Sequence, residues 1–532
     1  MTTPRPLPPR LRPGRLAPVL GFLAGALLLA AGADVSYYEE AAPSTLNPLF
    51  ARTMVDRRSQ ELVFDRLFYR SAITNELRSG LVESWERIGD GRSIKLKLKE
   101  GVKWHDGKPF GPDDVCFTIE AMLDPATPSE VAKGYREALV GCTAQRDNTV
   151  QIEFTKVYHN PRERVAFSVL PKHAFNGTAI NPDLEFSSRP IGTGPMKASR
   201  GKHELKFSAM KNPHHDPKIA GLIQTEGGDP LLQVRSLLNG GVQGVISVSP
   251  TYRGDVSASD EVALKSYDLR SWWFVALNTG SPFLRDKRVR QALDLTIDRM
   301  RLRELTIGVD PNDPNPPCEF VSGPFVQSSP YYNRAVKTAE RANPEKAEAL
   351  MREAGANKQA GRWVMGGQSI TLRIGIDSSL QTEARDLLNQ IGNQLQEGGF
   401  DRRVDNVTPD EWVHQAVTGR LKGQYDALIG KWSFGVVEDV NDMFHTRQGT
   451  QGSLNIFDYS DPQVDAILAR YDAAKTDTEA QDAYHDLHAY LAKELPYLFL
   501  WKLDTKSAWR NEIRSNTISP YYYFTEFDGW RL

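Results

Sequence analysis

The sequence contains little cysteine and no strong excess of either charge. Three cysteines occur among 532 residues, so the chain is not a disulfide-rich scaffold. Lys and Arg total 65 and Asp and Glu total 67, which gives no indication of a nucleic-acid partner. Hydrophobic residues make up 40% of the chain and charged residues 25%, as in ordinary soluble globular proteins.

The sequence also lacks common catalytic and metal-binding motifs. It has no Gly-x-Ser-x-Gly elbow, no His-Glu-x-x-His, no Cys-x-x-Cys and no Walker lysine. The best metal candidates are His203, His214 and His215 with Asp216, but two of these histidines are adjacent in a proline-flanked turn. We therefore expect no enzymatic activity, no bound metal and no cofactor.

Long hydrophobic runs are scarce as well, and the only one lies at the N-terminus. Four arginines precede an apolar run from Leu16 to Ala31, and Ala31-Gly32-Ala33 fits a signal-peptidase site. Residues 1–33 are predicted to be a cleaved signal peptide. The alternative is a retained membrane anchor, although a run of about 16 residues is short for a span. No cysteine lies near the cleavage site, so we expect a non-lipidated protein in the periplasm or outside the cell.

The three cysteines leave the disulfide pattern open. An exported chain allows one disulfide and one remaining thiol, and sequence proximity favours Cys116 with Cys142 over a pair that includes Cys318. The alternative is three buried cysteines that serve as small apolar side chains.

Periodic patterns along the chain indicate both strands and helices. Ile94, Leu96 and Leu98 alternate with three lysines, which predicts a strand with one buried face. A helix is predicted from Pro112 to Asp124, because proline and acidic residues suit a helix N-terminus. With 532 residues and no short repeat, the sequence predicts an α/β protein of several domains.

The segment that begins at Trp272 is the most unusual. It starts as a strand rich in aromatic and branched residues, breaks between Asn278 and Pro282, and continues as a helix capped by Asp286. Side chains alternate along a strand, so three consecutive bulky rings cannot all face one core. We expect at least one ring of Trp272, Trp273 and Phe274 to point elsewhere, toward a cleft.

Several segments together resemble one known family. Residues 81–86 read Leu-Val-Glu-Ser-Trp-Glu, and residues 98–110 read Leu-Lys-Glu-Gly-Val-Lys-Trp-His-Asp-Gly-Lys-Pro-Phe. With the following Asp114-Val115, this block is similar to the signature of the family-5 extracellular solute-binding proteins. These are the oligopeptide-, dipeptide- and nickel-binding receptors of ABC importers. Further matches follow in the family's order at residues 190–195, Asn278, 289–293, 297–299, 347–351 with 354–355, 425–427 and 495–496.

The resemblance implies an α/β, two-lobed periplasmic-binding-protein-like fold with an extra inserted domain in the first lobe. The expected division is a signal peptide (1–33), a first lobe (34–68, 168–270 and 505–532), its inserted domain (69–167) and a second lobe (271–504). The family closes its lobes around a ligand by a hinge and then docks on a membrane permease.

One position departs from the peptide-binding members of this family. In those members, an aspartate three residues after a tryptophan holds the peptide's α-ammonium group. The matching tryptophan here is Trp432, and the third residue after it is Gly435. Glu438 or Asp439 would replace that aspartate only if the loop is reshaped.

The sequence thus predicts a monomeric substrate-binding protein that captures peptides or a similar extended solute and works with an ABC permease. The alternatives are an exported hydrolase and a chaperone-like or sensor protein with the same two-lobed fold. For each aromatic candidate, the alternative role is packing in the core. The predicted ligand-binding residues are Trp272, Trp273, Phe274, Trp412, Trp432, Ser433 and Phe434, with Arg52 and Met54 as weaker candidates from the first lobe.

Overall fold

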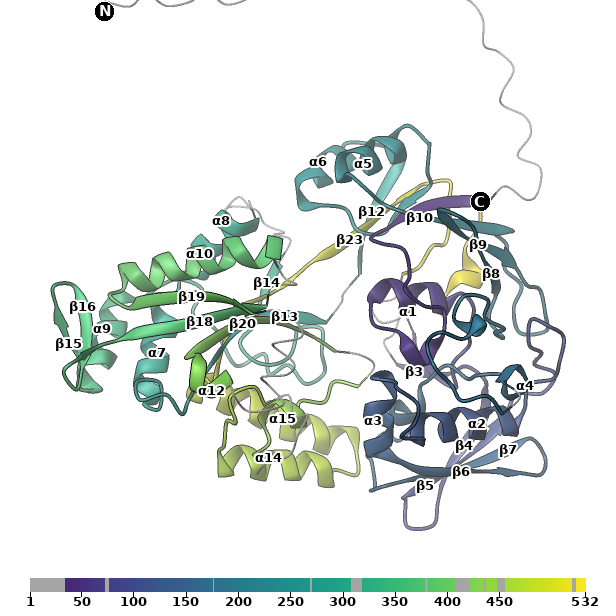
Figure 1. Ribbon diagram of the computed structural model, residues 1–532, viewed down its shortest axis with the longest axis horizontal. Helices are drawn as coiled ribbons and strands as arrows, with labels where there is room; N and C mark the ends of the chain where they lie inside the picture. Colours follow the sequence, from purple (N-terminus) through teal and green to yellow (C-terminus); the bar gives the residue numbers. More distant parts are fainter. Residues whose placement is uncertain are drawn as a thin grey trace, which may run out of the picture.

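The computed structural model describes residues 34–71, 76–175, 177–267, 270–307, 318–377, 381–407, 421–434, 437–446, 455–518 and 523–532. The predicted signal peptide, Trp412 and Gly435 lie outside these residues. The described chain forms two lobes that lie side by side, each built around its own sheet (Figure 1). This is the predicted α/β, two-lobed class of fold.

The first lobe is built on a seven-stranded mixed sheet. The strand order is β12-β23-β11-β1-β10-β9-β8, with β1 parallel to both β10 and β11. The strand β23, which comes from near the C-terminus, lies inside this sheet between β12 and β11. The strands are β1 (Val35–Glu39), β8 (Met196–Arg200), β9 (Glu204–Ala209), β10 (Gly221–Glu226), β11 (Gly244–Val245), β12 (Val262–Tyr267) and β23 (Thr505–Arg510).

Short helices complete the first lobe. Helix α1 (Met54–Glu61) begins with a capping box, in which Thr53 accepts a hydrogen bond from the backbone N–H of Asp56 and Asp56 accepts one from that of Thr53. The other helices here are α4 (Lys172–Phe175), α5 (Pro230–Leu238), α6 (Arg253–Ser257) and the 3-10 turns η1 (Pro48–Phe50), η2 (Glu163–Val165), η3 (Glu185–Ser187), η4 (Pro250–Tyr252) and η6 (Phe527–Gly529).

A glycine-rich bend at residues 189–196 packs against the end of α1. A Cβ on Gly192 would lie 1.8 Å from the carbonyl oxygen of Val63, so only glycine fits there. His105 binds the same bend, because its Nε2 lies 2.9 Å from the carbonyl oxygen of Gly194. The bend is therefore a packing element of the first lobe.

An inserted unit with its own four-stranded antiparallel sheet belongs to the first lobe. Ile94, Leu96 and Leu98 of β5 are fully buried, which confirms the predicted one-sided strand. The predicted helix is α2 (Pro112–Leu123), which packs on β6 and β7. The sheet order is β4-β5-β7-β6, with β4 (Val82–Ile88), β5 (Ser93–Leu98), β6 (Leu139–Gln145) and β7 (Thr149–Phe154); α3 (Val131–Ala138) and the hairpin β2 (Phe68–Arg70) and β3 (Leu77–Ser79) lie beside it.

The favoured cysteine pair is present in this unit. Cys116 of α2 and Cys142 of β6 form a disulfide, with Cα atoms 5.1 Å apart. The bond therefore ties the helix to an edge strand of the small sheet. Cys318 is a buried free thiol in the second lobe.

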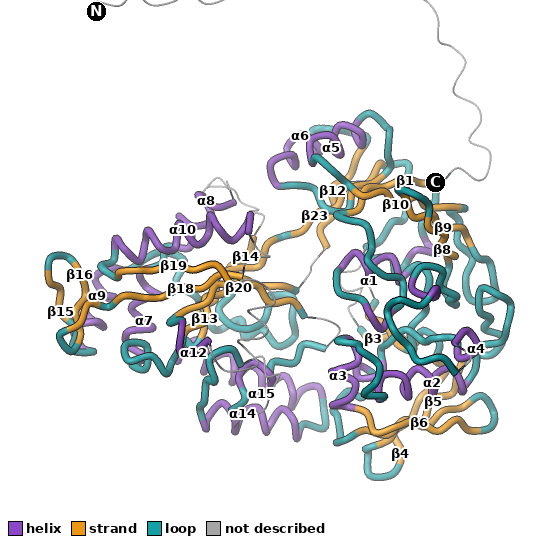
Figure 2. The backbone as a smooth tube through the Cα atoms, in the orientation of Figure 1, coloured by secondary structure: helices purple, strands orange, loops and turns teal. Residues whose placement is uncertain are grey.

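The second lobe is built on a five-stranded sheet in the order β19-β18-β20-β13-β21. Its strands are β13 (Ser271–Leu277), β18 (Thr371–Asp377), β19 (Asp401–Val407), β20 (Ala427–Ser433) and β21 (Tyr497–Phe499); smaller sheets contain β14 (Cys318–Phe320) with β22 (Trp501–Leu503), and β15 (Asn357–Gln359), β16 (Arg362–Met365) and β17 (Gln368–Ser369). Its helices are α7 (Lys287–Thr296), α8 (Arg299–Ile307), α9 (Pro344–Glu353), α10 (Gln381–Glu397), α12 (Leu421–Gln424), α13 (Asn441–Phe444), α14 (Pro462–Ala473) and α15 (Asp477–Glu494). As Figure 2 shows, helices lie on both sides of this sheet.

The three consecutive aromatic residues all lie in strand β13 and are all buried. Trp272, Trp273 and Phe274 are 0%, 1% and 3% exposed. Trp273 belongs to one hydrophobic core, while Trp272 and Phe274 belong to another. The expectation that one ring points away from the core is wrong, because β13 pairs with β20 on one edge and β21 on the other and both of its faces are covered.

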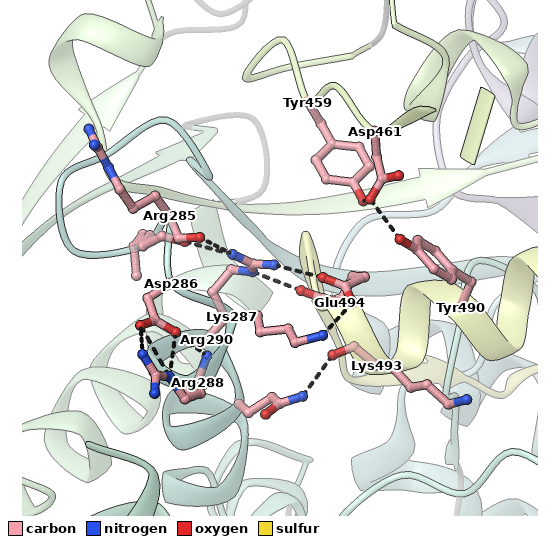
Figure 3. A network of polar contacts seen from close by, with 12 residues as sticks. Arg285, Asp286, Lys287, Arg288, Arg290, Tyr459, Asp461, Tyr490, Lys493 and Glu494 are labelled. Atoms are coloured by element: carbon pink, nitrogen blue, oxygen red, sulfur yellow. Dashed lines mark hydrogen bonds and ion pairs between the residues drawn. The ribbon is translucent and has the colours of Figure 1, made fainter. Parts of the chain in front are cut away.

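Helix α7 is anchored to the end of α15 by a polar network (Figure 3). Asp286 caps α7 by accepting a hydrogen bond from the backbone N–H of Arg288 at 2.9 Å, as predicted. Arg290 is 4% exposed and donates from Nε to the carbonyl oxygen of Glu494 at 2.8 Å. Lys287 forms an ion pair with the Glu494 side chain at 2.9 Å. These contacts join segments about 200 residues apart in the sequence.

The chain passes between the two large sheets at two places. One lies between β12, which ends at Tyr267, and β13, which begins at Ser271. The other lies at Asp504, between β22 and β23. Because β12 and β23 pair with each other, the two crossings lie close together at the same edge of the first sheet.

Candidate ligand-binding cavity

A cavity of about 430 Å³ lies between the two lobes. The first lobe contributes η1, α1, α3 and the segment 163–168, and the second lobe contributes Ser433, Phe434 and Val437 after strand β20. Small-molecule sites typically occupy about 300–1,000 Å³, so this cavity is at the smaller end of that range.

Much of the cavity wall is apolar. Tyr135 and Phe167 form an edge-to-face pair with ring centroids 5.5 Å apart, and both line the cavity. Leu49 and Met54 extend this surface on the first lobe. On the opposite side, Phe434 lines the cavity and is 8% exposed. Such a surface favours a ligand with apolar side groups.

Most of the charged side chains at the cavity have partners. Arg164 Nη2 donates to Oδ2 of Asp439 at 2.9 Å and thereby joins the two lobes. Burial alone would raise the pKa of Asp439, but Arg164 and a hydrogen bond from the backbone N–H of Asn441 outweigh burial and lower it. Glu163 forms an ion pair with Arg70. These groups are therefore engaged within the protein.

Two exposed charges at the cavity differ from this pattern. Arg57 on α1 and Glu130 at the start of α3 both line the cavity and are exposed. Among the described residues, neither side chain forms a hydrogen bond or an ion pair. The neighbouring Arg58 is 1% exposed and binds Glu39 at 2.6 Å. Consecutive positions of a helix face different directions, so α1 presents one arginine to the core and the next to the cavity.

The lobes also meet beside the cavity. Lys156 of the first lobe forms an ion pair with Asp472 of α14 at 2.8 Å. The rings of His159 and Tyr471 lie 5.3 Å apart, centroid to centroid, in an edge-to-face arrangement. Figure 1 shows α14 and α15 beside the inserted unit, on the side of α3. The lobes are therefore in contact in this structure.

Comparison with known proteins identifies the family. The model of the bacterial extracellular solute-binding proteins, family 5, matches residues 76–453. The chain belongs to family 5 of these proteins. Its curated relatives include the oligopeptide-binding protein AppA of Bacillus subtilis, 23% identical over 94% of this chain and 92% of AppA. The dipeptide-binding protein of Escherichia coli is 26% identical over 91% of this chain and 92% of its own.

Solved structures of family 5 proteins share the fold. The structure of Bacillus subtilis AppA with a nonapeptide has a TM-score of 0.76 and 21% identity, covering 94% of this chain and 99% of AppA. The structure of NikZ from Campylobacter jejuni with Ni(L-His) has a TM-score of 0.75 and 21% identity, covering 94% and 99%. At these identities the likeness establishes the two-lobed fold with its inserted domain.

The predicted site residues of this family 5 protein fall into three groups. Met54, Ser433 and Phe434 line the cavity. Arg52 is exposed just before α1 but does not line the cavity. Trp432 does not line the cavity either; it is half-buried against Phe434, with ring centroids 6.2 Å apart. The three aromatic residues of β13 are buried and do not line the cavity, while Trp412 lies outside the described residues.

Several cavity residues were missed by reasoning from the sequence. Arg57, Glu130, Tyr135 and Phe167 lie in segments without any distinctive motif. Helix periodicity places Arg57 and Arg58 on different faces of α1, but it does not show which face meets a cavity. Only the packing of distant segments brings these side chains together.

Of the four residues considered as metal ligands, His215 has a structural role in the first lobe. His215 lies between two carboxylates, with Nε2 3.0 Å from Asp65 and Nδ1 2.6 Å from Asp528. Burial lowers the pKa of His215, but the two carboxylates outweigh it and raise the pKa to about 10. Within the described part of the chain, no three His, Cys, Asp or Glu side chains are placed to hold a metal ion.

Of the helices in the described ranges, none combines the length and the apolar character needed to cross a bilayer.

Proposed function

We propose that this protein is the substrate-binding component of an ABC importer and captures a peptide or a similar extended solute between its lobes. The observation that carries the proposal is the apolar cavity between the lobes, lined by Met54, Tyr135, Phe167 and Phe434. Enclosure between two lobes buries most of a ligand's surface, and aromatic rings supply contact area. The printed names of family 5 relatives include oligopeptide- and dipeptide-binding proteins, which supports the peptide class.

Hinge closure is the proposed mechanism of capture. The hinge in this proposal consists of the two crossings, one between the end of β12 at Tyr267 and the start of β13 at Ser271 and the other at Asp504, where the chain leaves one large sheet for the other. In this proposal the first lobe comprises residues 34–68, 168–270 and 505–532 with its inserted domain, residues 69–167, and the second lobe comprises residues 271–504. A ligand that contacts both walls of the cavity binds the closed form more tightly and so shifts the population toward it.

Delivery to a membrane permease follows capture in this proposal. The mature chain, without residues 1–33, acts as a monomer in the periplasm or outside the cell. The arginine-preceded apolar run at the N-terminus supports export. The closed pair of lobes is the form that the permease recognises, since closure places both lobes in one fixed arrangement.

Ligand binding by the purified mature chain tests the proposal. Thermal unfolding and calorimetry are measured with di- to pentapeptides and, for comparison, with oligosaccharides. A bound peptide at about 100 times its Kd should stabilise the protein by about 2.7 kcal/mol. Chromatography of the same peptides after incubation should show them intact. Binding of sugars alone contradicts the peptide class, and cleavage of the peptides favours the hydrolase alternative.

A further inference from the structure

We infer that Glu130 and Arg57 hold the two oppositely charged ends of a short zwitterionic peptide in the cavity between the lobes. This inference rests on the proposed function and assigns the ligand's termini to named residues. Both residues belong to the first lobe, so they would bind the peptide before the second lobe closes on it.

The carboxylates that follow strand β20 are already engaged. Asp439 accepts the hydrogen bond from Arg164 at 2.9 Å. Glu438 is 4% exposed and forms a buried ion pair with Arg270. A peptide ammonium group at either carboxylate would have to displace an arginine from a largely desolvated pair, which is costly. Their existing contacts therefore argue against either carboxylate as the group that holds an ammonium end.

Glu130 is the carboxylate that remains. Two glutamates line the cavity among the described residues, Glu130 and Glu163, and Glu163 is paired with Arg70. The Glu130 side chain is exposed and has no hydrogen-bond or ion-pair partner within that part of the chain. It therefore accepts a hydrogen bond from an ammonium group without giving up an existing contact.

Arg57 has the corresponding role for a carboxylate. Three arginines line the cavity among the described residues: Arg164 binds Asp439, and Arg66 donates to the carbonyl oxygen of Ala166 at 3.4 Å. Arg57 is exposed and makes no such contact. A guanidinium group binds a carboxylate through two parallel N–H donors, so this side chain suits the C-terminus of a peptide.

The wall and the volume of the cavity restrict the rest of the ligand. Leu49, Tyr135 and Phe167 offer apolar contacts, so the side chains of the peptide should be apolar. A volume of about 430 Å³ favours a short peptide. The inferred ligand class is thus a short peptide with apolar side chains and two free termini.

Capped peptides test the assignment of each end. Calorimetric Kd values are measured for an apolar tripeptide, its N-acetylated form and its C-amidated form, with wild type, Glu130→Gln and Arg57→Gln. For wild type, each cap should weaken binding about 10- to 100-fold, as expected for a lost charged hydrogen bond. N-acetylation should have little further effect in Glu130→Gln, and C-amidation little further effect in Arg57→Gln.

Two control variants separate the specific contacts from general charge effects. Glu137→Gln changes an exposed glutamate on the same helix α3, and Arg235→Gln changes an exposed arginine on α5; neither residue lines the cavity. Both controls should bind all three peptides as wild type does. If the free tripeptide binds and capping has equal effects in wild type and the variants, the assignment is overturned while the proposed function stands. If wild type binds none of the peptides in this test or in the wider panel, both are overturned.

Discussion

Arg164 of the first lobe donates a hydrogen bond to Asp439 of the second lobe at 2.9 Å, at the edge of the cavity. Their side chains are 18% and 27% exposed, so water reaches the pair only in part. Because its two partners belong to different lobes, this ion pair forms only when the lobes are together, and in the proposed hinge closure it favours the closed form.

Breaking this pair should open the ligand-free protein. We expect Arg164→Gln and Asp439→Asn each to increase the radius of gyration in solution scattering and to weaken peptide binding about 3- to 20-fold. That range corresponds to a contribution of about 0.6–1.8 kcal/mol from one partly buried ion pair. The double variant should be no weaker than either single variant, because both changes remove the same contact.

The acid dependence of closure follows from the lowered pKa of Asp439. A carboxylate with a lowered pKa stabilises the closed form above its ordinary pKa of about 3.9 and loses that effect as the pH falls through the lowered value. The radius of gyration of wild type should therefore be the same at pH 5 as at pH 7. An equal radius of gyration for wild type and Asp439→Asn at pH 7 would contradict a role of this pair in closure.

Substitution of a buried aromatic residue should affect stability rather than binding. Trp273→Ala removes a side chain that is 1% exposed in the core of the second lobe, and we expect unfolding to become easier by about 3–5 kcal/mol. The Kd of the folded protein should change less than twofold. The matched variant Tyr135→Ala truncates a half-buried ring that lines the cavity, and it should weaken binding about 10-fold or more. A reversed outcome would place the ligand at β13.

Local sequence patterns predicted where individual strands and helices lie, but they did not predict which side chains reach the cavity. The alternation in residues 94–98 and the cap at Asp286 predicted β5 and the start of α7, because both signals depend on neighbouring residues. Trp272, Trp273 and Phe274 were expected to include a ring at a cleft, which holds only for a strand with a single core face. In β13, helices and loops from distant segments cover both faces.

The cavity was less predictable than the fold. Met54, Ser433 and Phe434 were among the predicted candidates and line it. Arg57 and Glu130 were not predicted, since their significance depends on which neighbouring charges are already paired. That information is a property of the packed structure and is not present in any motif.

The His215 contacts should make stability depend on alkaline pH. The two carboxylates raise the pKa of His215 from 6.5 to about 10, so their contribution is complete below pH 6.5 and decreases as the pH rises toward about 10. We expect His215→Gln to unfold more easily at pH 7 by about 3 kcal/mol, because two partly buried carboxylates lose their cation. The difference between wild type and variant should shrink at pH 10.5 in denaturant titrations. A constant difference across this range would contradict a charged His215.

Reduction of the disulfide should weaken the inserted unit. Cys116 and Cys142 are separated by 26 residues, and a loop of that size corresponds to about 3 kcal/mol of stabilisation. We expect the double variant Cys116→Ser, Cys142→Ser to have a free energy of unfolding that is lower by that amount and no longer depends on reductant, whereas Cys318→Ser should be destabilised by reductant as wild type is. Equal sensitivity of wild type and the double variant to reductant would contradict the pairing.

The interior position of β23 in the first sheet has a consequence for the order of folding. This strand comes from residues 505–510 and separates β12 from β11, so the sheet is incomplete until the end of the chain is available. The sheet of the second lobe needs no residue beyond Phe499. The second lobe can therefore complete its sheet first, although most of the first lobe precedes it in the sequence. Until β23 pairs with them, the facing edges of β12 and β11 expose unpaired backbone N–H and C=O groups. A chaperone would bind most readily at these edges.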